Sequence, residues 1–163
     1  MAIRPRVLAR SLKRWCAASA LALATACGPR GPVLELEWTG TDTGRATLVA
    51  TARLCEGNPL ELIAVSGDTG VAIGLFGEGA GQAGDYRIRE APVVARHGAT
   101  LGARWLDSAA VKAYRASRGS VTLSSGIPTL SGSFSAEARQ PGVLGPVTIT
   151  GSFRGVTVTG CGG

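Results

Sequence analysis

The sequence predicts an all-β protein, a single antiparallel β-sandwich or barrel of roughly 8–10 strands. Three observations favour this class. Apolar and polar residues alternate with a period of two from residue 33 onward. Clusters of Gly, Pro, Asp and Asn interrupt the alternation about every 8–12 residues, as turns between strands do. Helical character after residue 33 is limited to at most one short helix near 107–115, which argues against an α/β arrangement.

The first half of the domain divides into five expected strands. Segment 33–38 places leucines and a tryptophan on one face and glutamates on the other. Segment 45–53 alternates alanine and leucine with arginine and threonine. Segments 60–65 and 71–76 are almost continuously apolar, which is typical of strands that are covered on both faces. A short alternating segment at 86–89 completes this half.

The final third shows the clearest alternation, with strands expected at 120–124, 130–137 and 147–158. In the last of these the phase inverts at Arg154-Gly155. One extra residue in a strand exchanges the side chains that face the core, so we expect a β-bulge there.

An internal echo links two of these strands. Segment 129–134 (TLSGSF) returns nineteen residues later as 148–153 (TITGSF). We interpret the pair as a β-hairpin in which a glycine opposite or beside a phenylalanine lets the ring lie flat on the sheet. Phe134 and Phe153 share the apolar phase of their strands, as does Phe76, and all three are expected in the core.

Segment 107–115 is the one place after residue 33 where the sequence allows a helix. Asp107 is a good N-cap residue, and the alanines that follow have high helix propensity. A strand or an extended loop fits the same residues equally well, so the three alternatives stay open.

Residues 1–26 have the features of a signal peptide. The first fourteen residues carry five basic side chains and no acidic one, and Trp15 begins an uncharged run of 12 residues that ends at Ala26. A membrane-spanning helix needs about 20 apolar residues, so this run is too short to be a permanent anchor. Small residues at its end suit a cleavage site, and the sequence therefore predicts export.

The segment from Ala24 to Cys27 resembles the lipobox of bacterial lipoproteins, in which the cysteine is acylated and becomes the first mature residue. It departs from that pattern at Ala24, where leucine is usual. The resemblance implies a lipidated Cys27 that carries palmitate, a linker within 27–32, and a β-rich domain at 33–163 on the periplasmic or outer-membrane face. Cleavage by ordinary signal peptidase, with Cys27 as the first secreted residue, stays open.

A second resemblance covers about forty residues. The strands between Gly119 and Phe153 are similar to the C-terminal part of lipid-anchored β-proteins of bacterial envelopes whose function is undescribed. It implies an envelope location and no particular activity.

The cysteines support the same interpretation. Four occur, at positions 16, 27, 55 and 161, and Cys16 lies in the leader. If Cys27 carries lipid, Cys55 and Cys161 remain as one pair, which we expect to form a disulfide in an oxidising compartment. Because the two lack C-x-x-C spacing, a structural role is favoured over a redox-active one.

Export changes how the charge is interpreted. The whole chain has a net charge of +6, but five of its 17 basic residues precede residue 27. Twelve basic side chains then face 11 acidic ones, so the mature domain is nearly neutral. A nucleic-acid partner, which a strongly basic chain would suggest, is therefore not expected.

No catalytic or metal-binding motif emerges from the sequence. Residues 79–84 fit G-x-G-x-x-G, but strand-like alternation follows at 85–89 in place of the helix that a dinucleotide site needs. His97 is the one histidine of the chain, and it lacks the partners of a catalytic triad or a zinc site. We expect no enzyme activity, no cofactor and no metal.

Binding is the remaining function class. Trp105 and Tyr114, with neighbouring Arg104 and Arg115, form the candidate ligand-binding surface, although core filling is the favoured role for the aromatics. The sequence thus favours a non-enzymatic cell-envelope lipoprotein with a binding or structural accessory role, toward an envelope protein or a glycan. The alternative is a small-ligand or carbohydrate carrier that uses an aromatic surface or a barrel mouth lined by Trp105, Tyr114 and Tyr86.

Overall fold

The computed structural model describes residues 31–40, 42–57, 59–90, 97–108, 110–143 and 145–161, so the leader and Cys27 lie outside the described residues. Within these ranges, no helix has the length and apolar character that crossing a membrane requires. The strands are Val33–Thr39 (β1), Gly44–Leu54 (β2), Leu60–Ser66 (β3), Thr69–Phe76 (β4), Gly84–Arg87 (β5), Gly98–Asp107 (β6), Ala110–Ser125 (β7), Thr129–Arg139 (β8) and Val147–Gly160 (β9).

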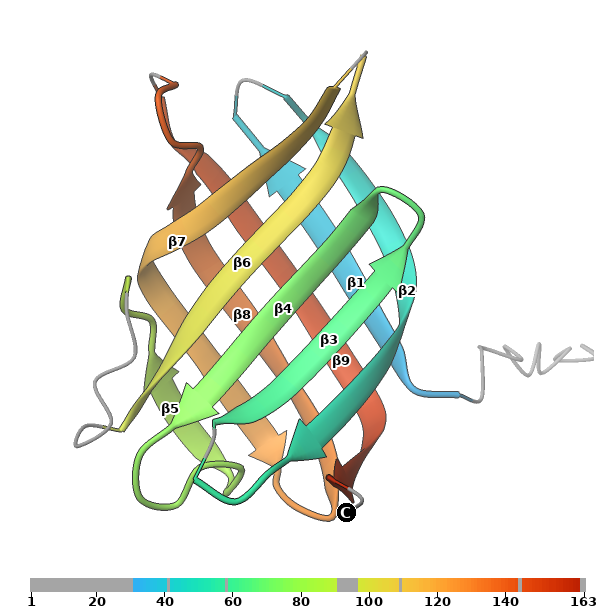
Figure 1. Cartoon of the computed structure of the whole chain (residues 1–163), viewed down its shortest axis with the longest axis vertical. Coiled ribbons are helices and arrows are strands. Elements are labelled where there is room, and N and C mark those ends of the chain that lie inside the picture. Colours follow the sequence, from blue (N-terminus) through green and yellow to red (C-terminus); the bar gives the residue numbers. More distant parts are fainter. Residues whose placement is uncertain are drawn as a thin grey trace, which may run out of the picture.

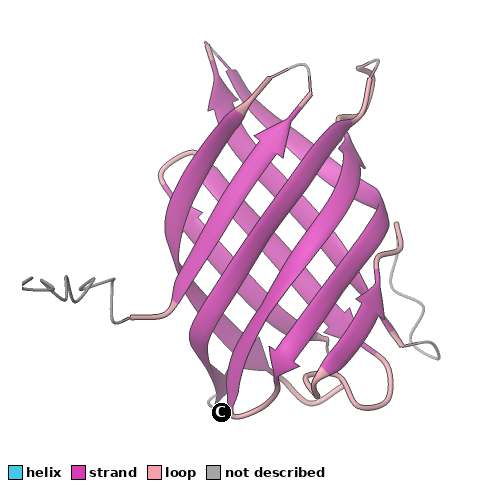
Figure 2. Ribbon diagram, turned by 180° about the vertical axis from the view of Figure 1, so that it is seen from behind, coloured by secondary structure: helices cyan, strands magenta, loops and turns pink. Residues whose placement is uncertain are grey.

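Eight of these strands close into an antiparallel barrel, in the order β7-β6-β4-β3-β2-β1-β9-β8 (Figure 1). Pairing of β7 with β8 completes the circle, and the view from behind shows strands crossing the far wall as well (Figure 2). The short β5 pairs with β7 along the same edge as β6, nearer the end of β7. The all-β prediction is confirmed, and of its two architectures the barrel is the one present.

The barrel has a fork at the start of β1. β1 lies between β2 and β9 and is antiparallel to both, beginning at Val33. Beyond that point β2 and β9 meet directly and pair in parallel over Ala52–Leu54 and Val158–Gly160. The backbone carbonyl of Pro32 accepts a hydrogen bond from the Ala50 amide at 3.1 Å. Residues 31 and 32 therefore leave β1 at the side of the barrel (Figure 1).

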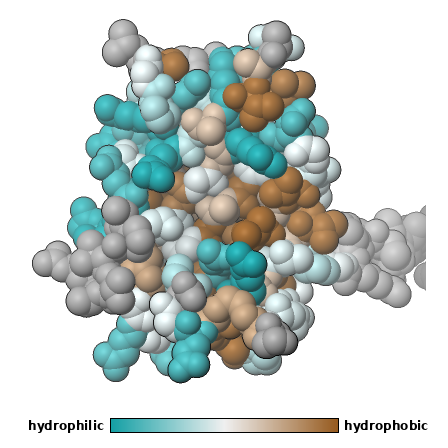
Figure 3. Space-filling view, viewed as in Figure 1, coloured by the Kyte–Doolittle hydropathy of each residue, from teal (hydrophilic) through white to brown (hydrophobic). Residues whose placement is uncertain are grey.

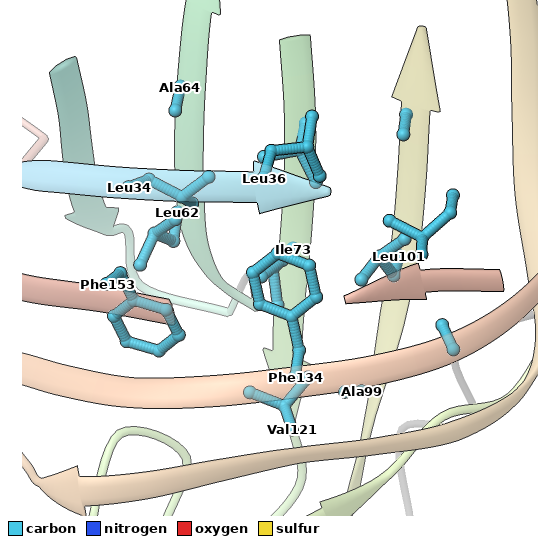
Figure 4. Packing of buried hydrophobic residues seen from close by; sticks show 14 of the residues in the cluster. Leu34, Leu36, Leu62, Ala64, Ile73, Ala99, Leu101, Val121, Phe134 and Phe153 are labelled. Atoms are coloured by element: carbon cyan, nitrogen blue, oxygen red, sulfur yellow. The ribbon is translucent and has the colours of Figure 1, made fainter. Parts of the chain in front are cut away.

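Side chains at alternate positions point into the barrel, as the two-residue period of a strand requires. In β1, Leu34 and Leu36 are fully buried, whereas Glu35 and Glu37 are exposed. Residues from all nine strands meet in one apolar cluster, part of which is shown in Figure 4. The three phenylalanines predicted for the core are all buried, which confirms that expectation.

Strands β8 and β9 form the hairpin that the repeated sequence predicted. Gly132 lies opposite Phe153, and Phe134 lies opposite Gly151. A Cβ atom on Gly151 would sit 2.3 Å from Cζ of Phe134, so the ring occupies the space above the glycine. Each copy of the repeat thus supplies a ring to the other copy's glycine, and both phenylalanines point inward in Figure 4.

The predicted bulge at Arg154-Gly155 is also present. Leu130 pairs with Val156 and Gly132 with Phe153, so β9 uses three steps where β8 uses two. Gly155 has a φ of 67°, in the left-handed region that glycine adopts at low cost. The extra residue returns Val156 to the interior, where it is fully buried.

Segment 107–115 forms no helix, which corrects one of the three alternatives. It is the hairpin between β6 and β7, in which Asp107 pairs with Ala110 and Ser108 turns the chain at a φ of 48°. Asp107 does not cap a helix but forms an ion pair with Lys112. The hydrogen bond that the Lys112 ammonium group donates to the Asp107 carboxylate raises the pKa of Lys112 above its usual value.

Candidate binding groove on the barrel wall

The structure separates the four residues of the predicted ligand-binding surface. Trp105 and Tyr114 point into the barrel, where they are 1% and 6% exposed. Arg104 and Arg115 are their chain neighbours, so they point outward and are exposed. Strand geometry thus places the aromatics and the arginines on opposite sides of the wall, and the four do not form one surface.

The two aromatics help to fill one end of the barrel, near the β6–β7 hairpin. The rings of Trp38, Trp105 and Tyr114 are stacked, with successive centroids 4.6 and 4.2 Å apart. A carboxylate oxygen of Asp42 accepts hydrogen bonds from both indole nitrogens, at 3.3 Å from Trp38 and 2.9 Å from Trp105. Core filling, the role favoured for these aromatics, therefore accounts for their positions.

Tyr86 fills the opposite end of the barrel, near β5. Its ring is fully buried, and its hydroxyl lies within hydrogen-bond distance of the backbone oxygens of Gly79 and Gln82, at 2.9 and 2.7 Å. Burial raises the pKa of this hydroxyl above its usual value, against the opposing effect of the loop's hydrogen bonds. With Trp105 and Tyr114 also buried, the three residues proposed to line a barrel mouth are packing residues, so the interior lends the carrier alternative no support.

His97 lies beside Tyr86 at this end of the barrel. Its ring stacks on Tyr86 with centroids 4.1 Å apart, and its two nitrogens lie 3.2 Å from the backbone oxygens of Glu78 and Asp85. These contacts hold the loop before β5 against the chain that enters β6. Within the described part of the chain, no group of three or more His, Cys, Asp or Glu side chains is placed to hold a metal ion.

The candidate groove lies on the outside of the barrel. A groove of about 930 Å³ runs over the outer faces of β3, β4, β6 and the start of β7. Its floor is made by small residues that point outward, Gly70, Ala72 and Gly74 on β4 and Gly102 on β6. Figure 3 shows apolar surface on this face of the molecule.

The two sides of the groove differ in chemistry. Ile63 and Val65 of β3 form an apolar side, next to Ala72 and Gly70 respectively in the register of the sheet. On the other side, Arg115 lies across from Gly102, and Arg104 lies across from Ala113. Arg89 joins this side, since its amide bonds to the Ala99 carbonyl at the edge of β6.

In the described part of the chain, the arginines of the groove have no acidic partner. Neither Arg104 nor Arg115 forms an ion pair within the described ranges, and the buried Nε of Arg89 has no hydrogen-bond partner there. Among the described lining residues the acids are Glu61 and Glu90, and Glu61 is already paired with Arg53 at 2.7 Å. This side of the groove is therefore cationic.

The apolar segments 60–65 and 71–76 did not predict this groove, and their interpretation needs a correction. We expected both strands to be covered on both faces. In the barrel only one face is buried in the core, while Val65 and Ala72 on the other face are exposed. The signal that the sequence did contain is the alternation of large and small residues in 70–75, where Val71, Ile73 and Leu75 point inward.

The opposite wall of the barrel is polar. Outward positions of β7, β8 and β9 carry hydroxyl side chains, and a smaller depression there is lined mainly by serines and a threonine. The two walls of the same barrel thus differ, with apolar and cationic residues on one and hydroxyl groups on the other.

The predicted disulfide is present. Cys55 follows β2 and Cys161 follows β9, their Cα atoms are 5.2 Å apart, and the two sulfur atoms are bonded. The bond closes the fork at which β2 and β9 pair in parallel. The lipidation expected at Cys27 lies outside the described residues.

Because comparison with known proteins found no match, the assignment of function rests on the geometry described above. No protein-family model, curated protein or solved structure matches the chain.

Proposed function

We propose that this chain is an exported, lipid-anchored binding protein of the bacterial cell envelope, without enzymatic activity, and that the outer groove is its binding site. The observation that carries the proposal is the uncovered apolar face of β3 and β4. Strands that are apolar on both faces normally lie between two covering layers. Here the described residues cover the inner face alone, so a ligand or partner would supply the second layer.

The packed interior supports a rigid frame. Side chains fill the barrel, and a filled core transmits strain and resists deformation. The groove would therefore keep its shape before and after binding. A small-ligand or carbohydrate carrier remains the second candidate, with its site moved from the barrel mouth to this outer groove.

A blocked groove tests the assignment. A Cβ on Gly102 would meet no atom closer than the Tyr114 carbonyl at 3.7 Å, and its φ is not in the left-handed region. Gly102→Leu should therefore fold and fill the groove. Ser133→Leu adds the same side chain to the exposed outer face of β8 and serves as the matched control.

The readout is the fluorescence of Nile red, a neutral apolar dye. We expect the wild-type protein and Ser133→Leu to enhance it equally and Gly102→Leu to lose most of the enhancement. Equal enhancement by all three proteins would refute the groove as the binding site.

The anchor is tested separately, because it rests on the sequence around Cys27 and not on the groove. Cells that express the wild-type chain should incorporate labelled palmitate into it, and Cys27→Ala should abolish the label. Unchanged labelling of Cys27→Ala would show that the lipid lies elsewhere. Absence of label from the wild-type chain would favour simple secretion.

A further inference from the structure

The arrangement of charge in the groove narrows the class of ligand. Arg104 lies across from Ala113, and Arg115 lies two residues further along β7, so the two arginines are diagonal neighbours on the outer face. Such neighbours are roughly 7–8 Å apart, within reach of long side chains. Two guanidinium groups at this spacing can both donate hydrogen bonds to one anionic group placed between them.

Among the described residues, no ion pair offsets these two charges. Like charges held side by side repel each other, and the apolar floor beneath them weakens the screening that water provides. Glu61 is occupied by Arg53, and Glu90 lies on the β5 side with Arg89. An anion bound at Arg104 and Arg115 would relieve the repulsion, which is the charge complementarity that the groove lacks on its own.

The rest of the groove suits an extended apolar body. From Gly70 to Gly74 the floor runs along β4 for roughly 13 Å, at the rise of a strand, with the Val65 side chain over Gly70 and the Thr100 hydroxyl over Gly74. Ile63 and Val65 border it on the side away from the arginines. A concave groove accepts a single chain, whereas a bilayer presents a broad surface that contacts protruding residues. The shape thus favours one amphiphile molecule over a membrane surface.

We propose that the groove binds an anionic amphiphile, an acyl chain that ends in a carboxylate, with the chain on the Gly/Ala floor and the carboxylate between Arg104 and Arg115. This inference rests on the proposed function, since it names the ligand class of the same groove. It adds that affinity depends on the charge of the ligand's head group as well as on its apolar body.

The experiment compares three ligands with the same twelve-carbon chain. Laurate, glycerol monolaurate and dodecyltrimethylammonium carry negative, neutral and positive head groups, and each is titrated below its micelle concentration by calorimetry. The protein is the exported chain with Cys27→Ser, so that no acyl group of its own competes for the groove. We expect affinity to fall in the order laurate, monolaurate, dodecyltrimethylammonium.

The variant Arg104→Gln/Arg115→Gln keeps the aliphatic part of both side chains and a polar head group, and removes their charge. It should weaken laurate binding roughly tenfold or more, because charge-assisted hydrogen bonds are lost, and change monolaurate binding less than about twofold. Arg45→Gln/Arg154→Gln removes the same net charge from β2 and β9, outside the groove, and should leave laurate binding unchanged.

The outcomes separate the inference from the function on which it rests. If laurate and monolaurate bind equally, and both are lost in Gly102→Leu, the groove remains a binding site and the anionic preference is overturned. If Gly102→Leu leaves all binding intact, both proposals fail. Binding to anionic phospholipid vesicles without binding of monomeric laurate would assign the face to a membrane and overturn the inference. So would a dimer in sedimentation that Gly102→Leu dissociates, since a second copy would then fill the groove.

Discussion

Replacing two glycines by alanine should have effects of opposite sign, and the pair tests how the barrel is packed. At Gly151 a Cβ would lie 2.3 Å from the backbone oxygen of Glu35 and 2.3 Å from Cζ of Phe134. The backbone contact cannot be relieved by a rotamer change, because β1 pairs with β9 at this point. At Gly102 the nearest atom would be 3.7 Å away, an ordinary van der Waals distance.

The magnitudes follow from these distances. Overpacking of a filled core costs about 1–3 kcal/mol, and alanine recovers about 0.5–1 kcal/mol of backbone entropy relative to glycine. Gly151→Ala should therefore lower the free energy of unfolding by about 1–2 kcal/mol. Gly102→Ala meets no clash and should raise it by about 0.5 kcal/mol, through the unfolded state.

Urea unfolding followed by tryptophan fluorescence measures both effects. With a slope of about 2 kcal/mol/M, the midpoint should fall by roughly 0.5–1 M in Gly151→Ala and rise by roughly 0.25 M in Gly102→Ala. The double variant Gly151→Ala/Phe134→Leu should recover part of the loss caused by the alanine, since the smaller side chain vacates the contested space. The packing argument fails if the two alanine variants shift the midpoint in the same direction.

Three further predictions concern the ends of the barrel and the fork. Removal of the disulfide in Cys55→Ser/Cys161→Ser opens a loop of 106 residues and should lower the free energy of unfolding by up to about 4–5 kcal/mol, measured by urea unfolding; an unchanged midpoint would contradict this. Asp42→Ala leaves two indole N–H groups without their acceptor and should cost about 1–3 kcal/mol in thermal unfolding followed by near-UV circular dichroism, whereas Asp42→Asn, which keeps an oxygen acceptor, should cost less. Burial raises the pKa of Tyr86 in the folded state, so the stability from its neutral hydroxyl is fully present below about pH 10 and is lost as the pH rises through the folded-state value; Tyr86→Phe should flatten this alkaline decline, and an identical decline in both proteins would refute the assignment.

The sequence predicted what depends on neighbours along the chain. Alternation in β1 assigned the buried and exposed faces correctly, and the phase inversion at Arg154-Gly155 located the bulge, because both follow from the period of a single strand. The Gly–Phe pairs of the β8–β9 hairpin could be predicted for the same reason. Closure as a barrel could not be predicted, because it depends on the pairing of β7 with β8. The same local pattern of apolar and polar residues would fit a sandwich equally well.

The candidate site was the harder prediction. Trp105 and Arg104 are adjacent in the chain, but their side chains lie on opposite sides of a one-layer wall, so proximity in sequence was misleading. The helix allowed at 107–115 rested on Asp107, whose residue type suits a tight turn as well as a cap. The groove itself requires that β3, β4 and β6 be neighbours, and only the fold brings their small outward residues together.

The fork at Val33 has a mechanical consequence. Any pulling force on the preceding residues enters the barrel sideways, at the point where β1 separates β2 from β9. Such a force would tend to pull β1 out from between β2 and β9, breaking its backbone hydrogen bonds to both strands. The covalent bond between Cys55 and Cys161 joins those two neighbours just beyond the point of entry. Because β1 pairs with both flanking strands, the load would be divided between them, and the disulfide would keep their ends joined.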